Sequence, residues 1–255
     1  KSVTHVPGTK CYLCARSHTI SYRSFSDIAQ AISSARGDAY IRNAAGVMAK
    51  INQELQAPIN EVFFAPIIVL VEGIEDVAYI TSYLHLMGKF EEFRRYGCHI
   101  VATNGKEHME MPFAVARQLG IPTFLVFDSD SDAKSGWIER HRKLNATLLN
   151  LAGISPEPFP AQTLWQNDLV QWPTQLSAVV EKEFDEMVLN QAKIEAHKSF
   201  PSTGDLAKNA LFIPKMLEQT WKQGEKSTSL TRLCNSILSF AESHSVPAQI
   251  VGDTL

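Results

Sequence analysis

Two groups of acidic residues each follow an apolar run of the sequence. The first group, residues 72–76, follows the run at 67–71, and the second, residues 128–132, follows the run at 123–127. Unbroken apolar runs of this length are typical of strands buried on both faces of a parallel sheet, and the carboxyl ends of such strands meet in one crevice. Crowded carboxylates repel one another unless cations neutralise them. The sequence therefore predicts one or two divalent metal ions held by oxygen ligands.

Glu72 and Asp76 are the candidate ligands of the first group. Glu72 directly follows the apolar run, where a carboxylate needs a partner to offset its desolvation. Asp76 is expected in the first turn of the next helix, where the helix dipole also stabilises an acid that has no catalytic role. For Asp76, a metal ligand and a structural acid are therefore both open.

Asp128 and Asp130 are the candidates of the second group, because alternate residues of an extended segment point the same way and can reach one cation. Asp132 is either a further ligand or a solvated neighbour. The spacing also fits a calcium-binding EF-hand loop that ends at Glu139, but Ala133 stands where that loop needs glycine, and a strand leads into it. Aspartyl-phosphate phosphatases also place Asp-x-Asp after a strand, but after their first strand rather than the third.

The elements that must position these residues alternate between strand and helix. We expect strands at residues 67–71, 99–102, 123–127 and 161–165. We expect helices between and after them at residues 76–87, 111–119 and 137–151. This order predicts an α/β fold, with a Rossmann-like parallel sheet of about four strands sandwiched by helices.

Helical segments flank this core on both sides. The pattern is helical at 27–65, and again at 168–190, 206–221 and 230–243. We therefore predict three parts: a helical segment or linker at 1–59, the catalytic α/β domain at 60–168 and a helical domain at 169–255.

Composition limits the partners. The formal net charge is −3, so contacts with DNA must come from local basic groups. The candidates are Lys106, Arg140, Arg142 and Lys143, with Arg94, Arg95 and His141 as further basic groups. Trp137, Trp165 and Trp172 are more typical of core or interface anchors than of base-stacking platforms. No segment approaches the roughly 20 apolar residues of a membrane span, and no signal peptide is visible, so we expect a cytoplasmic protein without a membrane partner.

The four cysteines do not form a disulfide framework in a chain of this size. Cys11, Cys14 and His18 could supply three zinc ligands, but no second ligand pair stands at zinc-finger spacing. Two ordinary thiols are the alternative.

The arrangement of Glu after the first strand, a glycine turn at 104–105 after the second and Asp-x-Asp after the third resembles the Toprim domain. More specifically, Glu-Val-Phe-Phe-Ala at 61–65 and Val-Glu-Gly-Ile-Glu-Asp at 71–76 resemble the overcoming-lysogenization-defect (OLD) family of nucleases. In that family an ABC-type ATPase precedes a Toprim nuclease. The resemblance covers about residues 55–135 well and the helical ends loosely.

The resemblance implies a DNA endonuclease that hydrolyses phosphodiester bonds by a two-metal mechanism, with two Mg²⁺ or Mn²⁺ ions. Glu72, Asp76, Asp128 and Asp130 are then its metal ligands and catalytic residues. The chain carries no Gly-x-x-x-x-Gly-Lys-Ser/Thr phosphate loop, so we expect it to be the C-terminal region, with ATP bound only by an ATPase domain outside it. The partners are DNA, the fused ATPase domain and, in the full-length protein, a homodimer mate.

The remaining catalytic groups are less determined. Glu181 and Glu183 are candidate ligands, although a charged run on a helix is usually a solvated face. The family often carries an acid soon after the fourth strand, whereas Asp168 here is followed by leucine and valine. The family's helical C-terminus supplies a lysine, for which Lys208 is the candidate and Lys215 and Lys226 are the alternatives.

Three alternative functions follow from the same domain type. A topoisomerase needs a tyrosine nucleophile on a separate domain, and a primase needs a zinc module and a nucleotide site; the sequence marks none of these. The third alternative, a degenerate Toprim domain that regulates or binds DNA, would bind metal without cleaving.

Overall fold

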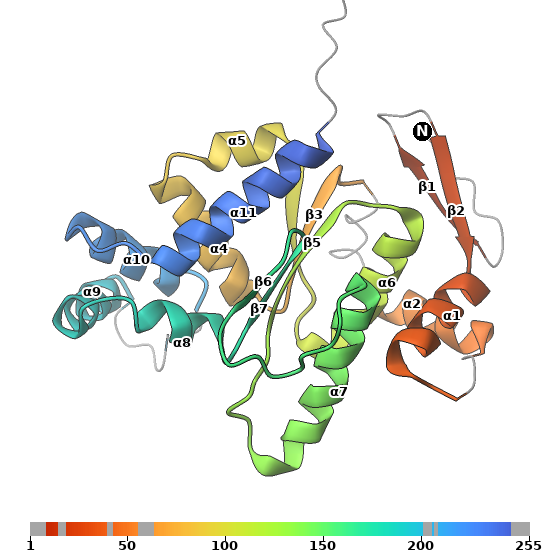
Figure 1. Cartoon of the computed structure of the whole chain (residues 1–255). Coiled ribbons are helices and arrows are strands. Elements are labelled where there is room, and N and C mark those ends of the chain that lie inside the picture. The colour runs from red at the N-terminus through yellow and green to blue at the C-terminus, as the bar shows by residue number, and fades with distance from the viewer. Residues whose placement is uncertain are drawn as a thin grey trace, which may run out of the picture.

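A five-stranded sheet forms the centre of the molecule (Figure 1). The computed structural model describes residues 9–14, 19–39, 43–55, 64–200, 206 and 209–245. The strands of the sheet, in spatial order, are β4 (Cys98–Ala102), β3 (Ile67–Val71), β5 (Thr123–Asp128), β7 (Leu169–Trp172) and β6 (Leu164–Trp165). All neighbouring strands pair in parallel except β6, which pairs with β7 in antiparallel orientation. The carboxyl ends of β3, β5 and β7 therefore lie at one edge of the sheet.

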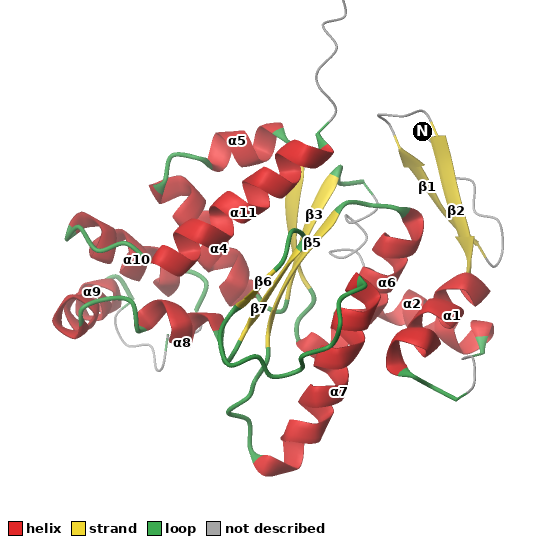
Figure 2. Cartoon of the chain, in the orientation of Figure 1, coloured by secondary structure: helices red, strands yellow, loops and turns green. Residues whose placement is uncertain are grey.

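Helices cover both faces of the sheet (Figure 2). One face packs against α4 (Ile74–Leu86), α8 (Leu176–Glu181), α9 (Glu186–Lys198), α10 (Phe212–Lys222) and α11 (Thr228–His244). The other face packs against α1 (Phe25–Arg36), α2 (Ala44–Glu54), α6 (Glu110–Leu119) and α7 (Ser135–Ala152). The side chains of β3 divide between the two cores, since Val69 and Val71 lie in the first and Ile68 and Leu70 in the second. This two-sided burial explains the unbroken apolar run.

The predicted fold class is confirmed, since a mostly parallel sheet lies between helices. The expected strands at 67–71, 99–102 and 123–127 are β3, β4 and β5. The helices expected between them are α4 and α6, and α7 begins two residues earlier than expected. None of the described helices has the length and hydrophobicity needed to cross a membrane.

The strand prediction after α7 was wrong in place and direction. We expected the fourth strand at 161–165 and a helix from residue 168, whereas the strand beside β5 is β7, at 169–172. The short β6 is an antiparallel edge strand. Gln171 interrupts the apolar run of β7, but it is fully buried because its side-chain amide donates hydrogen bonds to Ser129 and Pro158.

The N-terminal region contains an unexpected hairpin of β1 (Thr9–Cys14) and β2 (Thr19–Ser24). Within the expected helical stretch at 27–65, α1 and α2 are present, and the helix expected after Pro58 lies outside the described residues. The side chains of Cys11 and Cys14, and all of His18, also lie outside the described part. The domain limits at 59/60 and 168/169 stay a prediction, although α11 and β3 share one core.

The three tryptophans differ in burial. Trp172 is fully buried, and Trp165 packs edge-on against it with the ring centroids 5.4 Å apart. Trp137 is 53% exposed, so it is not a core residue. The alternative expectation, an interface anchor, stays a prediction.

The Trp172→Ala substitution should lower the free energy of unfolding by about 3–5 kcal/mol, because a large buried side chain leaves a cavity. Trp137→Ala should change the free energy of unfolding by less than about 0.5 kcal/mol, since the side chain is largely exposed. Urea denaturation followed by circular dichroism measures both changes. Equal effects of the two substitutions would contradict the assignment of Trp172 to the core.

Candidate active site

Carboxylates from two neighbouring strands meet at the carboxyl edge of the sheet. Glu72 follows β3, and Asp128 is the last residue of β5. The two are in direct contact, because the backbone N–H of Asp128 donates a 2.7 Å hydrogen bond to Glu72 Oε1. The Oδ1 atom of Asp128 also accepts a hydrogen bond from the backbone N–H of Leu176, at the start of α8 (3.1 Å). The acids that follow the two apolar runs therefore lie close together, as the sequence predicts.

The loop after β5 turns sharply and is tied to β7. Asp130 has a φ of 53°, the left-handed conformation that aspartate adopts more readily than most residues. The N–H of Ser129 donates to the carbonyl of Trp172 (2.7 Å), and the hydroxyl of Ser131 donates to that of Pro173 (2.6 Å). These bonds hold the side chain of Asp130 beside that of Asp128.

Asp76 closes the turn between β3 and α4. Its Oδ2 atom accepts a 2.8 Å hydrogen bond from the backbone N–H of Gly73, and the residue is buried. The structural role is therefore observed. A role as metal ligand stays a prediction.

Lys106 is the cation inside the acidic crevice. It begins the short 3₁₀ helix η2 (Lys106–His108), after a turn in which Asn104 and Gly105 have φ values of 60° and 124°. Its side chain is only 2% exposed. The ammonium donates to Asp130 Oδ2 at 2.5 Å and lies 3.9 Å from Glu72 Oε1. We expected Lys106 on the open crevice as a phosphate contact; its partners in the structure are carboxylates instead.

His141 of α7 completes the cluster. Its Nδ1 atom lies 3.1 Å from Asp130 Oδ2 and 3.4 Å from Lys106 Nζ. The sequence indicated His141 only as one of several basic groups of α7. Its contact with Asp130 depends on the packing of α7 beside the loop, which no local pattern encodes.

The surroundings of Glu72 and Asp128 disfavour the charged forms of both side chains. Burial raises the pKa of Glu72 to about 8; the Lys106 ammonium and the hydrogen bond from Asp128 oppose this shift, while Asp130 and Asp76 add to it. Burial also raises the pKa of Asp128 well above its usual range, and the charge of Glu72 adds to that effect. Burial lowers the pKa of His141, with Lys106 contributing. A single ammonium therefore does not neutralise the crevice.

The side chains fit a divalent metal by their chemistry. Mg²⁺ and Mn²⁺ prefer oxygen ligands, and the acids Glu72, Asp128 and Asp130 lie near one another and supply carboxylate oxygens. As placed, no three acidic, histidine or cysteine side chains of the described residues surround a common metal position. The ammonium of Lys106 lies 2.5 Å from Asp130 and 3.9 Å from Glu72, two of the same acids.

The other predicted ligands have different partners or none. Asp132 is exposed in the loop after β5. Glu181 pairs with Lys193 at 2.8 Å. Glu183 accepts hydrogen bonds from Ser227 and Ser229 and so fastens the end of α8 to the start of α11. We therefore do not assign Glu181 or Glu183 to the metal site.

Of the candidate lysines, Lys215 and Lys226 have other partners than the acids at 72, 128 and 130. Lys208 lies outside the described residues. Lys215 pairs with Glu218 at 3.6 Å, and Lys226 lies over the ring of Trp221 at 4.7 Å. The identity of the catalytic lysine therefore stays a prediction, with Lys208 as the candidate.

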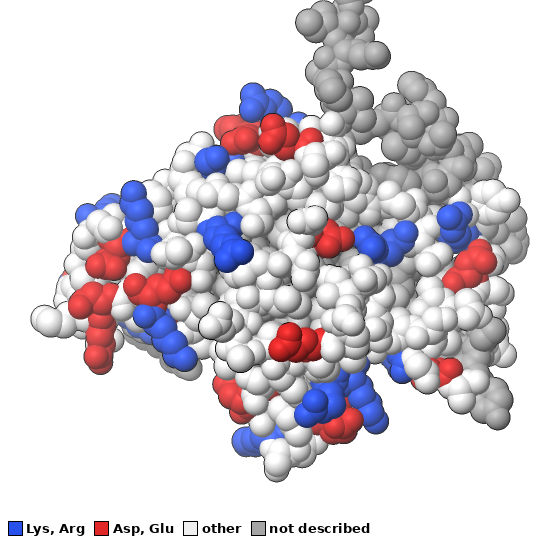
Figure 3. All heavy atoms as spheres, viewed as in Figure 1, with Lys and Arg blue, Asp and Glu red and all other residues white. Residues whose placement is uncertain are grey.

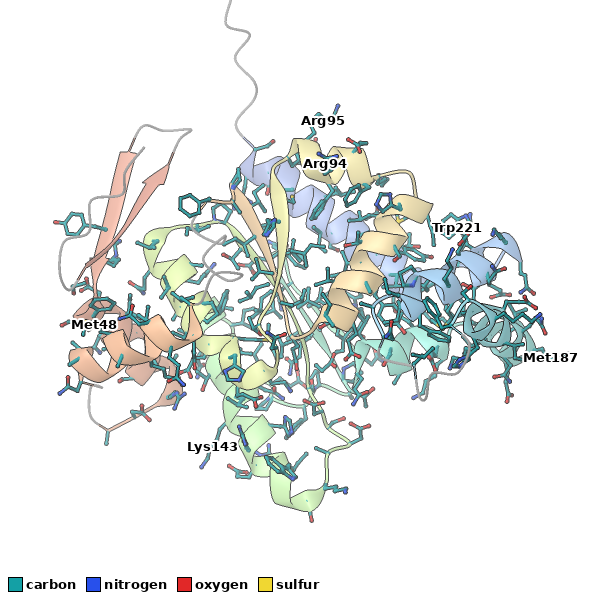
Figure 4. All side chains as sticks on the ribbon, turned by 180° about the vertical axis from the view of Figure 1, so that it is seen from behind. Met48, Arg94, Arg95, Lys143, Met187 and Trp221 are labelled. Atoms are coloured by element: carbon teal, nitrogen blue, oxygen red, sulfur yellow. The ribbon has the colours of Figure 1, made fainter. Side chains whose placement is uncertain are left out.

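The predicted DNA contacts of α7 are exposed, but acids accompany them. Arg142 lies 3.3 Å from Glu139, and Arg140 lies 3.6 Å from Glu107. Figure 3 shows positive and negative side chains together around α7, and Figure 4 shows Lys143 pointing outward from this helix. No purely basic surface surrounds α7 in these views, so the DNA-binding role of these residues stays a prediction.

The raised pKa of Glu72 predicts a pH dependence of stability. In EDTA, the free energy of unfolding should fall as the pH rises from about 5 to 8, because the folded protein binds more protons than the unfolded chain over this window. One such group gives a slope of at most about 1.4 kcal/mol per pH unit. Urea denaturation across this pH range should show a smaller slope for Glu72→Gln.

Glu139→Gln is the matched control, since the side chain of Glu139 is 64% exposed on α7. It should keep the wild-type pH dependence. An unchanged slope for Glu72→Gln would contradict the burial of an uncompensated carboxylate.

Comparison with known proteins gives one family match and several similar solved structures. Residues 63–130 match the family model described as "Overcoming lysogenization defect protein-like, TOPRIM domain". The chain is similar to the solved C-terminal region of the Burkholderia pseudomallei OLD protein, at 18% identity and a TM-score of 0.42, over 73% of this chain and 93% of that one. The corresponding region of the Xanthomonas campestris pv. campestris OLD protein gives 17% and 0.40, over 73% and 86%. None of the curated proteins compared with the chain matches it.

The matched segment includes β3, β4 and β5 and the carboxylates at 72, 76, 128 and 130. It coincides with the stretch whose motifs resemble the family. Residues 63–130 of this chain are therefore an OLD-like Toprim domain.

Proposed function

We propose that this chain is a DNA endonuclease that hydrolyses phosphodiester bonds with two Mg²⁺ or Mn²⁺ ions. The observation that carries the proposal is the hydrogen bond from the backbone N–H of Asp128 to the Glu72 carboxylate, which shows that the acidic ends of two neighbouring strands lie side by side. OLD-like Toprim domains are nuclease-type domains, and Toprim domains generally bind divalent metals. The oxygen ligands of this crevice suit such ions.

Glu72, Asp128 and Asp130 would hold the ions, and Asp76 is a further candidate. When bound, two ions would neutralise the charge that develops on the phosphate and activate the attacking water. Hydrogen bonds within the chain hold the side chains of the proposed ligands in position. The N–H of Leu176 holds one oxygen of Asp128, and the ammonium of Lys106 holds Asp130 in its turn.

The proposed partners are DNA and a fused ABC-type ATPase domain, as the family resemblance implies, and ATP would act only through that domain. The two similar solved structures are described as C-terminal regions of OLD proteins. A homodimer of the full-length protein and a cytoplasmic location are part of the same proposal and rest on the sequence predictions.

One observation favours a second function, a degenerate Toprim domain that regulates or binds DNA without cleaving it. Lys106 occupies the acidic crevice, and an ammonium that stayed there would compete with a metal for Asp130 and Glu72. Metal-dependent cleavage separates the two functions.

Supercoiled plasmid incubated with the protein and Mg²⁺ or Mn²⁺ should become nicked or linear, and EDTA should prevent this. Asp128→Asn should slow cleavage at least about 100-fold, because loss of even an outer-shell partner of a metal site costs 10- to 100-fold. Asp132→Asn is the matched control, since Asp132 is exposed in the same loop, and it should cleave at close to the wild-type rate.

Two results would contradict the proposed nuclease activity of this site. Intact plasmid with wild-type protein in both metals favours the regulatory domain. Equal cleavage by Asp128→Asn and wild type would place the activity elsewhere.

A further inference from the structure

An exposed tryptophan lies on α7 four residues before His141, which contacts Asp130. Trp137 is in the first turn of α7, and α7 begins soon after the loop that carries Asp128 and Asp130. The side chain is 53% exposed, which is unusual for a tryptophan. It also makes no contribution to either hydrophobic core.

The position of Trp137 on α7 relates it to the acidic residues through His141. Residues three and four apart on a helix share one face, so Trp137 shares a face with Arg140 and His141. His141 contacts Asp130 at 3.1 Å and lies 3.4 Å from Lys106 Nζ. Trp137 is therefore about one helical turn from His141, on the same face of α7.

Arg140 holds the indole in place. Its guanidinium carbon lies 5.3 Å from the centroid of the Trp137 ring, within the range of a cation–π contact. The same guanidinium lies 3.6 Å from Glu107 of η2, next to Lys106. An aromatic ring that is exposed and yet held by a cation on one side is suited to stacking on a ligand.

We propose that Trp137 is a stacking platform for an unpaired base of DNA bound at this site. The inference rests on the proposed nuclease function and narrows its substrate to DNA that has unpaired nucleotides near the scissile phosphate. Bases within a duplex already stack on both faces, whereas an unpaired base offers a free face to an aromatic side chain. The cation of Arg140 beside the ring adds attraction for the neighbouring phosphates.

Binding of a fluorescein-labelled 20-mer of thymidylate, measured by anisotropy in EDTA and in Ca²⁺, tests the platform without requiring cleavage. Trp137→Ala should weaken binding about 5- to 150-fold, the range for loss of one base–aromatic stack. Trp137→Phe should recover most of the affinity, because it keeps an aromatic ring. Binding of a duplex of the same length should change far less.

Met187→Ala is the matched control, since Met187 is an apolar side chain 82% exposed on α9, away from α7 in Figure 4. It should bind the 20-mer as wild type does. Three results would overturn the proposal: wild-type protein that does not bind the 20-mer in either condition, unchanged binding by Trp137→Ala, or equal losses for single strand and duplex.

Hydrolysis of bis(4-nitrophenyl) phosphate, a phosphodiester without bases, separates this inference from the proposed function. The wild-type protein should hydrolyse it, and Asp128→Asn should not, whatever the role of Trp137. If the wild-type protein hydrolyses neither this ester nor DNA, the nuclease proposal fails, and the binding comparison alone decides the role of Trp137.

Discussion

Like charges buried at one edge of a sheet are the constraint on which this structure depends. Glu72 and Asp128 are brought together by the parallel pairing of β3 with β5, and burial disfavours the charged form of both. A stable protein tolerates such a place only where hydrogen bonds or cations offset the cost. The backbone N–H of Asp128 donates a hydrogen bond to Glu72, and the backbone N–H of Leu176 donates one to Asp128. The end of β5 and the start of α8 therefore both stabilise these carboxylates.

Among the described residues, the ammonium of Lys106 lies against Glu72 and Asp130, and it comes from η2, a segment separate from β3 and β5. Lys106 reaches Asp130 from η2, and His141 reaches the same carboxylate from α7. A turn with two positive φ values, at Asn104 and Gly105, directs η2 into the crevice. Burial raises the pKa of Glu72 even though this ammonium opposes the shift, so the described residues leave the charged carboxylate poorly stabilised. A divalent metal would stabilise it.

The parts of the fold that sequence could predict are those with a strong local signal. The apolar runs predicted β3 and β5 correctly, and the helical patterns predicted α4 and α6 correctly. The proximity of the acids that follow the two strands was also predicted from the sequence. The strand β7 was missed because Gln171 breaks its pattern and is satisfied only by tertiary hydrogen bonds. The burial of Lys106 could not be predicted, since lysine is usually exposed and its partners come from distant segments. The hydrogen bonds from Ser227 and Ser229 to Glu183 could not be predicted either, because these partners also lie far away in the sequence.

The central claim is that the crevice holds divalent metal between Glu72, Asp128 and Asp130. Diffraction from crystals soaked in Mn²⁺, measured at a wavelength with a strong manganese anomalous signal, tests it most directly. The account predicts an anomalous peak within bonding distance of the Asp128 and Glu72 carboxylates, with the Lys106 ammonium moved away from it. A map without a peak there, with Lys106 still paired to Asp130, would contradict the claim.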